Sequence, residues 1–458
     1  MPRTIVVCLG GLTTGLALRW ADGGRLPHLS ALFAEAFGGA ITPLPVPYES
    51  SALESAFTGA PPGDHGVLSM WRMRERSVAD IPREIDRHED SPPYLWERPE
   101  FAGRKAVVVN VIGSHPPRPM PGLIVTYPFH QTIRCAWPRT VLPALIEAGT
   151  PMAHDVSVFF RAGDDRHAFA AAVTRVERQR MAAFRTLLRQ PADLFVVNLT
   201  IADRLSHFLW DEVAAGSPLA PEDTAIGQAY ALLDGFLGQI MTELRADDHL
   251  LAFTDLGFGP VRRFFSVNAI LAEAGFHAEG APLLPDPRRC IAFESAQGSH
   301  GIVLTRKDRF VDGRLDAAAA DRIEAEIAQL LREARDEESG SPLFATVTRG
   351  RDLYPGRRAD DAPDLVAIPF DEECQPLGHP YWANHVSRRC QTGWHRRDAA
   401  WALIGPRAGS PGKAPAMDMT AVAALMADLL DLDSPDLRRR SVLSQAVPHD
   451  QALPLARP

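Results

Sequence analysis

The chain has 458 residues, of which 46% are hydrophobic and 23% charged, as in an ordinary soluble globular protein. Its formal net charge of -9 creates no basic field that would attract a nucleic acid or an anionic membrane. The five cysteines have no paired spacing, which argues against a disulfide framework and favours the cytoplasm. Gly10-Gly11 interrupt the first apolar run too early for a signal peptide, and no run reaches the roughly 18 apolar residues of a membrane span.

Apolar, β-branched runs alternate with helical patterns in the first half of the chain. Helical periodicity predicts helices over 164–189 and 223–245. The apolar runs predict buried parallel strands over 4–9, 105–112, 193–200 and 249–255. This alternation predicts an α/β fold, with a mostly parallel central sheet flanked by helices on both faces. Ligands bind at the carboxyl ends of the strands in such folds, where Gly10, Asp203 and Asp255 stand.

The second half of the chain has a looser pattern. A helix rich in Ala and Glu is predicted over 315–335, within a region that we interpret as an inserted cap. A strand over 399–405 and a helix over 418–431 return to the pattern of the first half. The predicted organisation is a core of residues 1–262 and 386–446, a cap of residues 263–385 and a disordered tail of residues 447–458.

Three segments carry residues that suit metal chemistry. Asp203 and His207 are four residues apart in a predicted helix, so both side chains can reach one metal ion. By itself, such a pair on a helix is more often an ordinary polar contact. Asp255 precedes a glycine turn and is either a ligand or a helix cap, and His395 before the late strand is either a ligand or a structural residue.

The order of these segments is similar to that of a known family. The segments FTGAPPGDHGV (57–67), VVVNVIGSHPPRPMPGLIV (107–125), DLFVVNLTIADRLSHFLW (193–210) and TGWHRRDAAWALIGP (392–406) carry the likeness. Together they resemble the type I phosphodiesterase/nucleotide pyrophosphatase branch of the alkaline phosphatase superfamily, and its bacterial phosphohydrolase/phosphomutase-like members most of all. The resemblance runs along nearly the whole chain and implies the alkaline phosphatase-like fold.

The resemblance implies a site for two metal ions, usually zinc. One ion is bound in the family by the Asp and His of a D-x-x-x-H motif and by a late His. Asp203, His207 and His395 occupy these three positions here, so the resemblance implies that this metal site is intact.

The second metal site of the family has lost most of its residues in this chain. The family has an Asp at the end of the first strand, a Thr or Ser nucleophile and an Asp-His pair. The corresponding residues here are Gly10, Glu49, Asp255 and Leu256, so only Asp255 is retained. The resemblance therefore implies one bound ion per chain, with zinc favoured and manganese as the alternative.

Glu49 stands where the resemblance places the nucleophile. A carboxylate beside the metal site has the position of a general acid or base. The alternative is a solvated or salt-bridged residue in a decayed site. A shift of one residue in the alignment would instead place the hydroxyl of Ser50 at the nucleophile position.

The expected substrate is a small anionic molecule. Candidate substrate-binding residues are Arg262, Arg396, His379 and His385, although surface arginines are common without such a role. Neither a nucleic acid nor a membrane is expected as a partner, and the oligomeric state, a homodimer included, stays open.

The predicted function is that of a metal-dependent, hydrolase-like enzyme with one metal ion. Its catalytic residues would be Glu49, Ser50 and Asp255. The reaction would be hydrolysis or a related metal-assisted step on the small anionic substrate. Two alternatives remain. One is an inactive pseudoenzyme that binds a ligand or partner in the cleft that corresponds to the family's active site. The other is a conventional metal-dependent phosphodiesterase.

Overall fold

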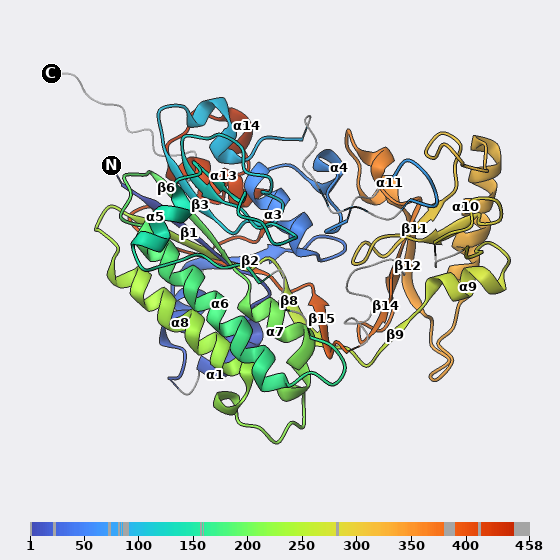
Figure 1. Cartoon of the computed structure of the whole chain (residues 1–458), viewed down its shortest axis with the longest axis horizontal. Coiled ribbons are helices and arrows are strands. Elements are labelled where there is room, and N and C mark those ends of the chain that lie inside the picture. Colours follow the sequence, from blue (N-terminus) through green and yellow to red (C-terminus); the bar gives the residue numbers. More distant parts are fainter. Residues whose placement is uncertain are drawn as a thin grey trace.

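A nine-stranded sheet forms the centre of the larger part of the molecule (Figure 1). Its strands, in spatial order, are β17 (Met417–Asp418), β2 (Phe37–Thr42), β16 (Ala400–Ile404), β7 (His249–Phe253), β1 (Thr4–Leu9), β6 (Leu194–Leu199), β3 (Ala106–Val109), β4 (Gly122–Val125) and β5 (Ala136–Trp137). The five strands from β7 to β4 are parallel, whereas β16 and β5 run antiparallel to their neighbours. The predicted α/β fold with a mostly parallel sheet is thus confirmed.

The computed structural model describes most of the chain. It covers residues 2–443, with the exception of residues 22–23, 72–74, 81–82, 84, 86–90, 156–157, 159, 281–283, 380–389 and 411–413. The predicted tail over 447–458 and the candidate His385 lie outside the described residues.

Helices cover both faces of the sheet (Figure 1). In β1, Ile5, Val7 and Leu9 pack on one face, whereas Val6 and Cys8 pack on the other. The helices on the first face are α1 (Thr14–Ala21), α2 (Pro27–Ser30), α6 (Arg166–Leu187), α7 (Ile201–Leu209) and α8 (Ala225–Thr242), with α5 (Val141–Glu147) at its edge. The helices on the second face are α3 (Glu49–Thr58), α13 (Ala421–Leu429) and α14 (Pro435–Arg438). Because both faces are covered, central strands can be apolar throughout.

A second, smaller lobe carries its own antiparallel sheet. Its strands, in spatial order, are β10 (Ala292–Glu294), β11 (Gly301–Leu304), β13 (Leu365–Pro369) and β12 (Phe344–Arg349). The helices α9 (Val267–Glu273) and α10 (Ala317–Glu333) pack on this sheet around a separate apolar cluster. All of these elements fall within residues 263–385, the range predicted as the cap. Short helices α4 (Pro62–His65) and α11 (Gly350–Leu353) lie where this lobe meets the core (Figure 1).

Two small pairs of strands complete the structure. β9 (Arg263–Phe265) pairs with β14 (Cys374–Pro376), and β8 (Gly257–Pro260) pairs with β15 (Gly393–Arg396). The β8–β15 pair matters for function, because β8 follows Asp255 directly and β15 carries His395.

The predicted strands and long helices agree with the structure to within a few residues. One difference has a clear physical cause. The strand predicted over 105–112 ends at Val109, because Asn110 adopts a left-handed conformation with a φ of 64° that a strand cannot contain. Among the helices that the structure describes, none is long and apolar enough to cross a membrane.

Candidate metal centre

The turn after β1 packs directly against the start of α7. The backbone N–H of Asp203 donates a hydrogen bond to the carbonyl oxygen of Gly10 at 3.1 Å. At Gly11 the φ is +71°, and a Cβ would lie 2.5 Å from the Cα of Asp203. Only glycine fits such a position. The glycine pair at the end of β1 therefore fixes the place of Asp203 at the carboxyl edge of the sheet.

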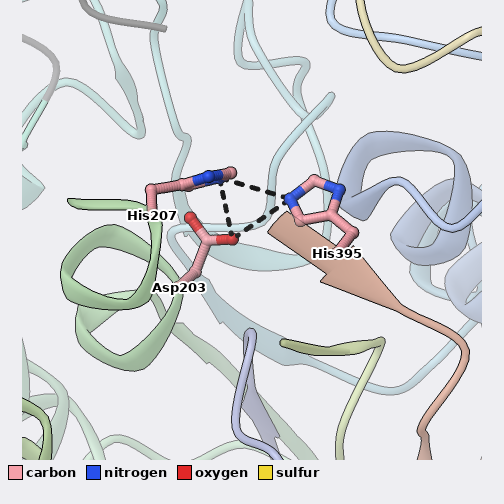
Figure 2. Close-up of side chains that lie close together, drawn as sticks. All are labelled: Asp203, His207 and His395. Carbon is pink, nitrogen blue, oxygen red and sulfur yellow. Dashed lines mark hydrogen bonds and ion pairs between the residues drawn. The ribbon is translucent and has the colours of Figure 1, made fainter. Parts of the chain in front are cut away.

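Asp203, His207 and His395 converge on one point (Figure 2). The Nε2 atoms of His207 and His395 are 3.2 Å apart, and each lies 3.7 Å from Oδ2 of Asp203. The first two residues come from consecutive turns of α7, and His395 reaches them from β15. In the described part of the chain, this is the one group of His, Cys, Asp or Glu ligand atoms within 4.8 Å of one another.

The hydrogen bonds around the three side chains suit a metal ligand set. The Nδ1 of His395 faces the carbonyl oxygen of Pro47 at 3.1 Å, so Nδ1 carries the proton and the lone pair of Nε2 points at the cluster. Oδ2 of Asp203 is buried and has no hydrogen-bond partner within the described residues. A tetrahedral zinc ion holds its nitrogen ligands about 3.3 Å apart, close to the separation of the two imidazoles. The three residues therefore fit a zinc ion.

Glu49 lies at the edge of this cluster. It is the first residue of α3, only 5% of its surface is exposed, and Oε2 lies 3.6 Å from Nε2 of His395. Burial, followed by the charge of Asp203, raises the pKa of Glu49 to about 8. Ser50 follows in the same helix and is fully buried, with no hydrogen-bond partner for Oγ among the described residues.

The positions that the resemblance assigns to a second metal site are occupied as follows. A Cβ at Gly10 would lie 3.0 Å from the carbonyl oxygen of Leu199 and 3.3 Å from Oδ1 of Asn198, so any side chain at this position would be tightly packed. Leu256 is completely buried in the apolar core on the α7 side of the sheet. Asp255 is buried, and its Oδ1 accepts hydrogen bonds from the backbone N–H groups of Gly11 and Leu256. Asp255 thus caps the turn as well as facing the site.

The charges around the cluster favour a cation. Burial raises the pKa of Asp203, but the neighbouring imidazoles of His207 and His395 outweigh burial and lower it. Burial is also the main cause that raises the pKa of Asp255 to about 7, and the charges of Asp203 and Glu49 add to it. Three carboxyl groups so close together repel one another when ionised, and a divalent ion would relieve this repulsion.

A buried network of charged side chains contacts the first turn of α7 through Arg204. Arg204 donates from Nε to Oδ2 of Asp155 at 3.2 Å and from Nη2 to the hydroxyl of Tyr127 at 2.9 Å. Arg180 in α6 donates to Glu177 at 2.7 Å and lies 3.5 Å from Oδ1 of Asp155. This network was not predicted from the sequence. The only sequence signal for it was the arginine inside the D-R-L-S-H motif, next to a predicted metal ligand.

The stabilising effect of Asp155 on the fold should be lost in acid. Burial raises the pKa of Asp155, but Arg204, Arg180 and Thr200 outweigh burial and lower it from 3.8 to about 2. A carboxyl group with a lowered folded-state pKa stabilises the fold above its unfolded pKa and loses that effect as the pH falls. We expect a loss of about 2 kcal/mol of unfolding free energy from this group between about pH 4 and pH 2.

In Asp155→Asn, the free energy of unfolding should depend less steeply on pH between pH 4 and pH 2. Urea unfolding at several pH values measures the effect. Asp211→Asn is the control, because Asp211 pairs with Arg166 at the surface, where an ion pair contributes little. Equal slopes between pH 4 and pH 2 for wild type and Asp155→Asn would contradict the role assigned to Asp155.

The predicted substrate-binding residues lie in three different settings. Arg262 is bound at the surface to Glu338 and Asp371, at 2.9 and 2.8 Å. Arg396 is next to His395 but donates to backbone carbonyl oxygens of Trp394 and His395 itself. His379 is buried against Phe293, with ring centroids 5.9 Å apart, in a small cavity where the cap meets the 75–80 segment. The structure does not gather these three residues around the candidate metal ligands, although Arg396 and His395 line one cavity.

Comparisons with known proteins agree with this architecture. The family model for type I phosphodiesterase / nucleotide pyrophosphatase matches residues 4–398. No curated protein sequence matches the chain. A phosphonoacetate hydrolase from Sinorhizobium meliloti 1021, solved with phosphonoacetate, is 15% identical, with a TM-score of 0.58 over 94% of this chain and 96% of that chain. Murine ectonucleotide pyrophosphatase / phosphodiesterase 5 is 13% identical, with a TM-score of 0.55 over 94% of this chain and 95% of that one. At such identities the likeness concerns the fold.

Proposed function

The chain belongs to the type I phosphodiesterase/nucleotide pyrophosphatase family, a family of metal-dependent hydrolases within the alkaline phosphatase superfamily, and from this premise we propose that it works with a single metal ion. Asp203, His207 and His395 would hold the ion, which we propose to be zinc. The convergence of their three ligand atoms is the observation that carries the proposal. The reaction would be the hydrolysis of a small anionic substrate, or a closely related step.

The proposed chemistry divides between the ion and the protein. A zinc ion in this place would supply a Lewis acid that polarises an oxygen of the substrate. Glu49 would hold or accept a proton at Oε2, since this carboxyl group occupies the nucleophile position and lies next to the cluster. The backbone carbonyl of Pro47 keeps His395 in the tautomer that presents Nε2. The buried Asp255 would keep the turn after β1 in position through its two backbone hydrogen bonds.

The residues at the positions of the family's second metal site support a departure from ordinary phosphodiester chemistry. Glu49 has no hydroxyl from which to form the covalent intermediate that the resemblance implies. The two positions that would complete the second site offer no ligand atom, because Gly10 has no side chain and Leu256 is buried in the core. A single metal ion can hold one of the reacting oxygens, whereas a pair of ions holds both the attacking and the leaving oxygen.

Hydrolysis of a generic aryl phosphodiester should therefore be negligible. We expect that bis-p-nitrophenyl phosphate, given to the zinc-loaded protein, releases p-nitrophenol no faster than zinc in buffer alone. The release is followed by absorbance. Ser50→Ala and Ser51→Ala are measured in parallel. Fast turnover that Ser50→Ala abolishes and Ser51→Ala preserves would show that Ser50 is a nucleophile, and would contradict the proposal.

A binding protein without turnover is the second candidate. The observation that favours it is the same replacement of ligands at the second site by Gly10 and Leu256. Such a protein would keep both its metal ion and its affinity for an anion, yet turn over no member of a panel of phosphonates, phosphate monoesters and carboxylic esters.

A further inference from the structure

A cavity of about 40 Å³ lies where the core meets the cap, and one of the candidate metal ligands lines it. Its wall includes Trp394 and His395 of β15 and, from the cap, Gln375 of β14. The other apolar residues that line it are Pro45, Pro47, Ile368 and Pro369. This volume is several times the ~10–15 Å³ that one water molecule needs, so the cavity can take a group of a few non-hydrogen atoms.

The residues on the core side of this cavity also contact the candidate metal ligands. The ring of Trp394 stacks on His395, with centroids 4.4 Å apart, and its centroid lies 5.0 Å from that of His207. The carbonyl oxygen of Pro47 faces Nδ1 of His395 at 3.1 Å, and Glu49 follows two residues later at the start of α3. The cavity and the proposed metal site therefore share a wall.

Gln375 brings a buried hydrogen-bond acceptor to this cavity. The residue is only 4% exposed, and its Nε2 donates to the carbonyl oxygen of Glu372 at 2.8 Å, which identifies the other end of the amide as Oε1. Oε1 is buried and accepts no hydrogen bond from any residue that the structure describes. Because a buried acceptor without a donor is unfavourable, a group that fills the cavity gains by donating to Oε1.

We propose that this cavity binds a neutral hydrogen-bond donor of the substrate, a hydroxyl or a primary amide, with Oε1 of Gln375 as the acceptor. The inference rests on the proposed function, because the donor belongs to a substrate whose anionic group lies at the metal site. A cationic donor such as an ammonium is disfavoured, since Arg396 and Arg397 line the same cavity and Glu372 is the one acidic residue among its described lining residues. The apolar part of the wall suits the carbon atoms that carry the donor.

Two pairs of phosphonates test this inference. The pairs are 2-hydroxyethylphosphonate with propylphosphonate and 3-hydroxypropylphosphonate with butylphosphonate, and within each pair a hydroxyl group replaces a methyl group of similar size. Each compound is titrated calorimetrically into the zinc-loaded protein, and zinc is counted by elemental analysis in the same samples. We expect wild type to bind the hydroxylated member of at least one pair about 3- to 10-fold more tightly, the effect of one hydrogen bond.

Three variants locate the origin of this preference. Gln375→Leu keeps the approximate size of the side chain but lacks the acceptor, so it should abolish the preference and leave the zinc content unchanged. Gln329→Leu is the control and should keep the preference, because Gln329 is exposed in α10 and pairs with Glu333. Ile368→Phe narrows the cavity and should weaken the binding of the hydroxylated compound about 3-fold or more.

The possible outcomes separate this inference from the proposed function. A zinc-loaded wild type that binds both members of each pair equally, or binds neither, would overturn the role of Gln375, and so would a preference that persists in Gln375→Leu. If Gln375→Leu does not fold, an unchanged affinity in Ile368→Phe would overturn it. A wild type that holds no zinc contradicts the proposed function instead. In that case the same comparison on the metal-free protein still decides the role of Gln375.

Discussion

Replacement of His395 or His207 by alanine is expected to remove the bound metal ion. Each histidine would supply one of the three proposed ligand atoms, and two ligand atoms alone would not hold a tetrahedral ion firmly. We expect the zinc content to fall from about one ion per chain to near zero after dialysis. The fold should persist, because the cluster lies at the edge of the sheet and both apolar cores are formed elsewhere.

A second Asp–His pair in the same chain provides a matched control. His28 lies 2.9 Å from Asp234, on the face of the sheet that α8 covers, and has no part in the cluster. His28→Ala should therefore keep its zinc. Undiminished zinc in both His207→Ala and His395→Ala would show that these residues are not the ligands.

Glu49→Gln is expected to lower turnover by about 10²–10⁴-fold, the usual contribution of a general acid or base. The substitution keeps the shape of the side chain but removes its capacity to exchange a proton. Zinc content should not change, because Glu49 is not among the three atoms that converge. The assay uses the member of the phosphonate, phosphate monoester and ester panel that wild type turns over fastest.

The same helix supplies the control for this substitution. Glu54 in α3 is also buried, but it accepts a hydrogen bond from the hydroxyl of Tyr94 at 2.7 Å and lies outside the metal cluster. Glu54→Gln should keep its turnover, whereas Glu49→Gln should lose it. Equal turnover in wild type and Glu49→Gln would remove Glu49 from the mechanism.

The sequence predicted the parts of the fold that follow from local pattern. The apolar runs at β1, β6 and β7 are buried on both faces, and such strands stand out in a sequence without any knowledge of their partners. The spacing of Asp203 and His207 likewise placed both side chains on one face of a helix. The helix begins at Ile201, two residues before Asp203, and only Thr200 separates it from the end of β6 at Leu199.

Other parts of the site depend on tertiary contacts that no local pattern reveals. His395 meets the other ligands only because β15 pairs with β8, and the resemblance to a family was needed to associate it with them. The hydrogen bonds of Arg204 join side chains from three separate segments, with Asp155 at the end of residues 151–155, which form neither helix nor strand. The sequence suggested that Arg262 could bind an anionic substrate, but in the structure it forms ion pairs with two carboxylates of the cap.

The number of zinc ions that one chain binds distinguishes a single metal site from two sites or none. Metal-free protein is titrated with zinc by calorimetry, and the product is checked by elemental analysis after gel filtration. We expect one tight site in wild type and none in Asp203→Asn, since Asp203 would supply the only carboxylate oxygen of the three-residue cluster. Two tight sites would show that a second metal centre persists despite Gly10 and Leu256, and no tight site would show that the three converging side chains do not bind zinc.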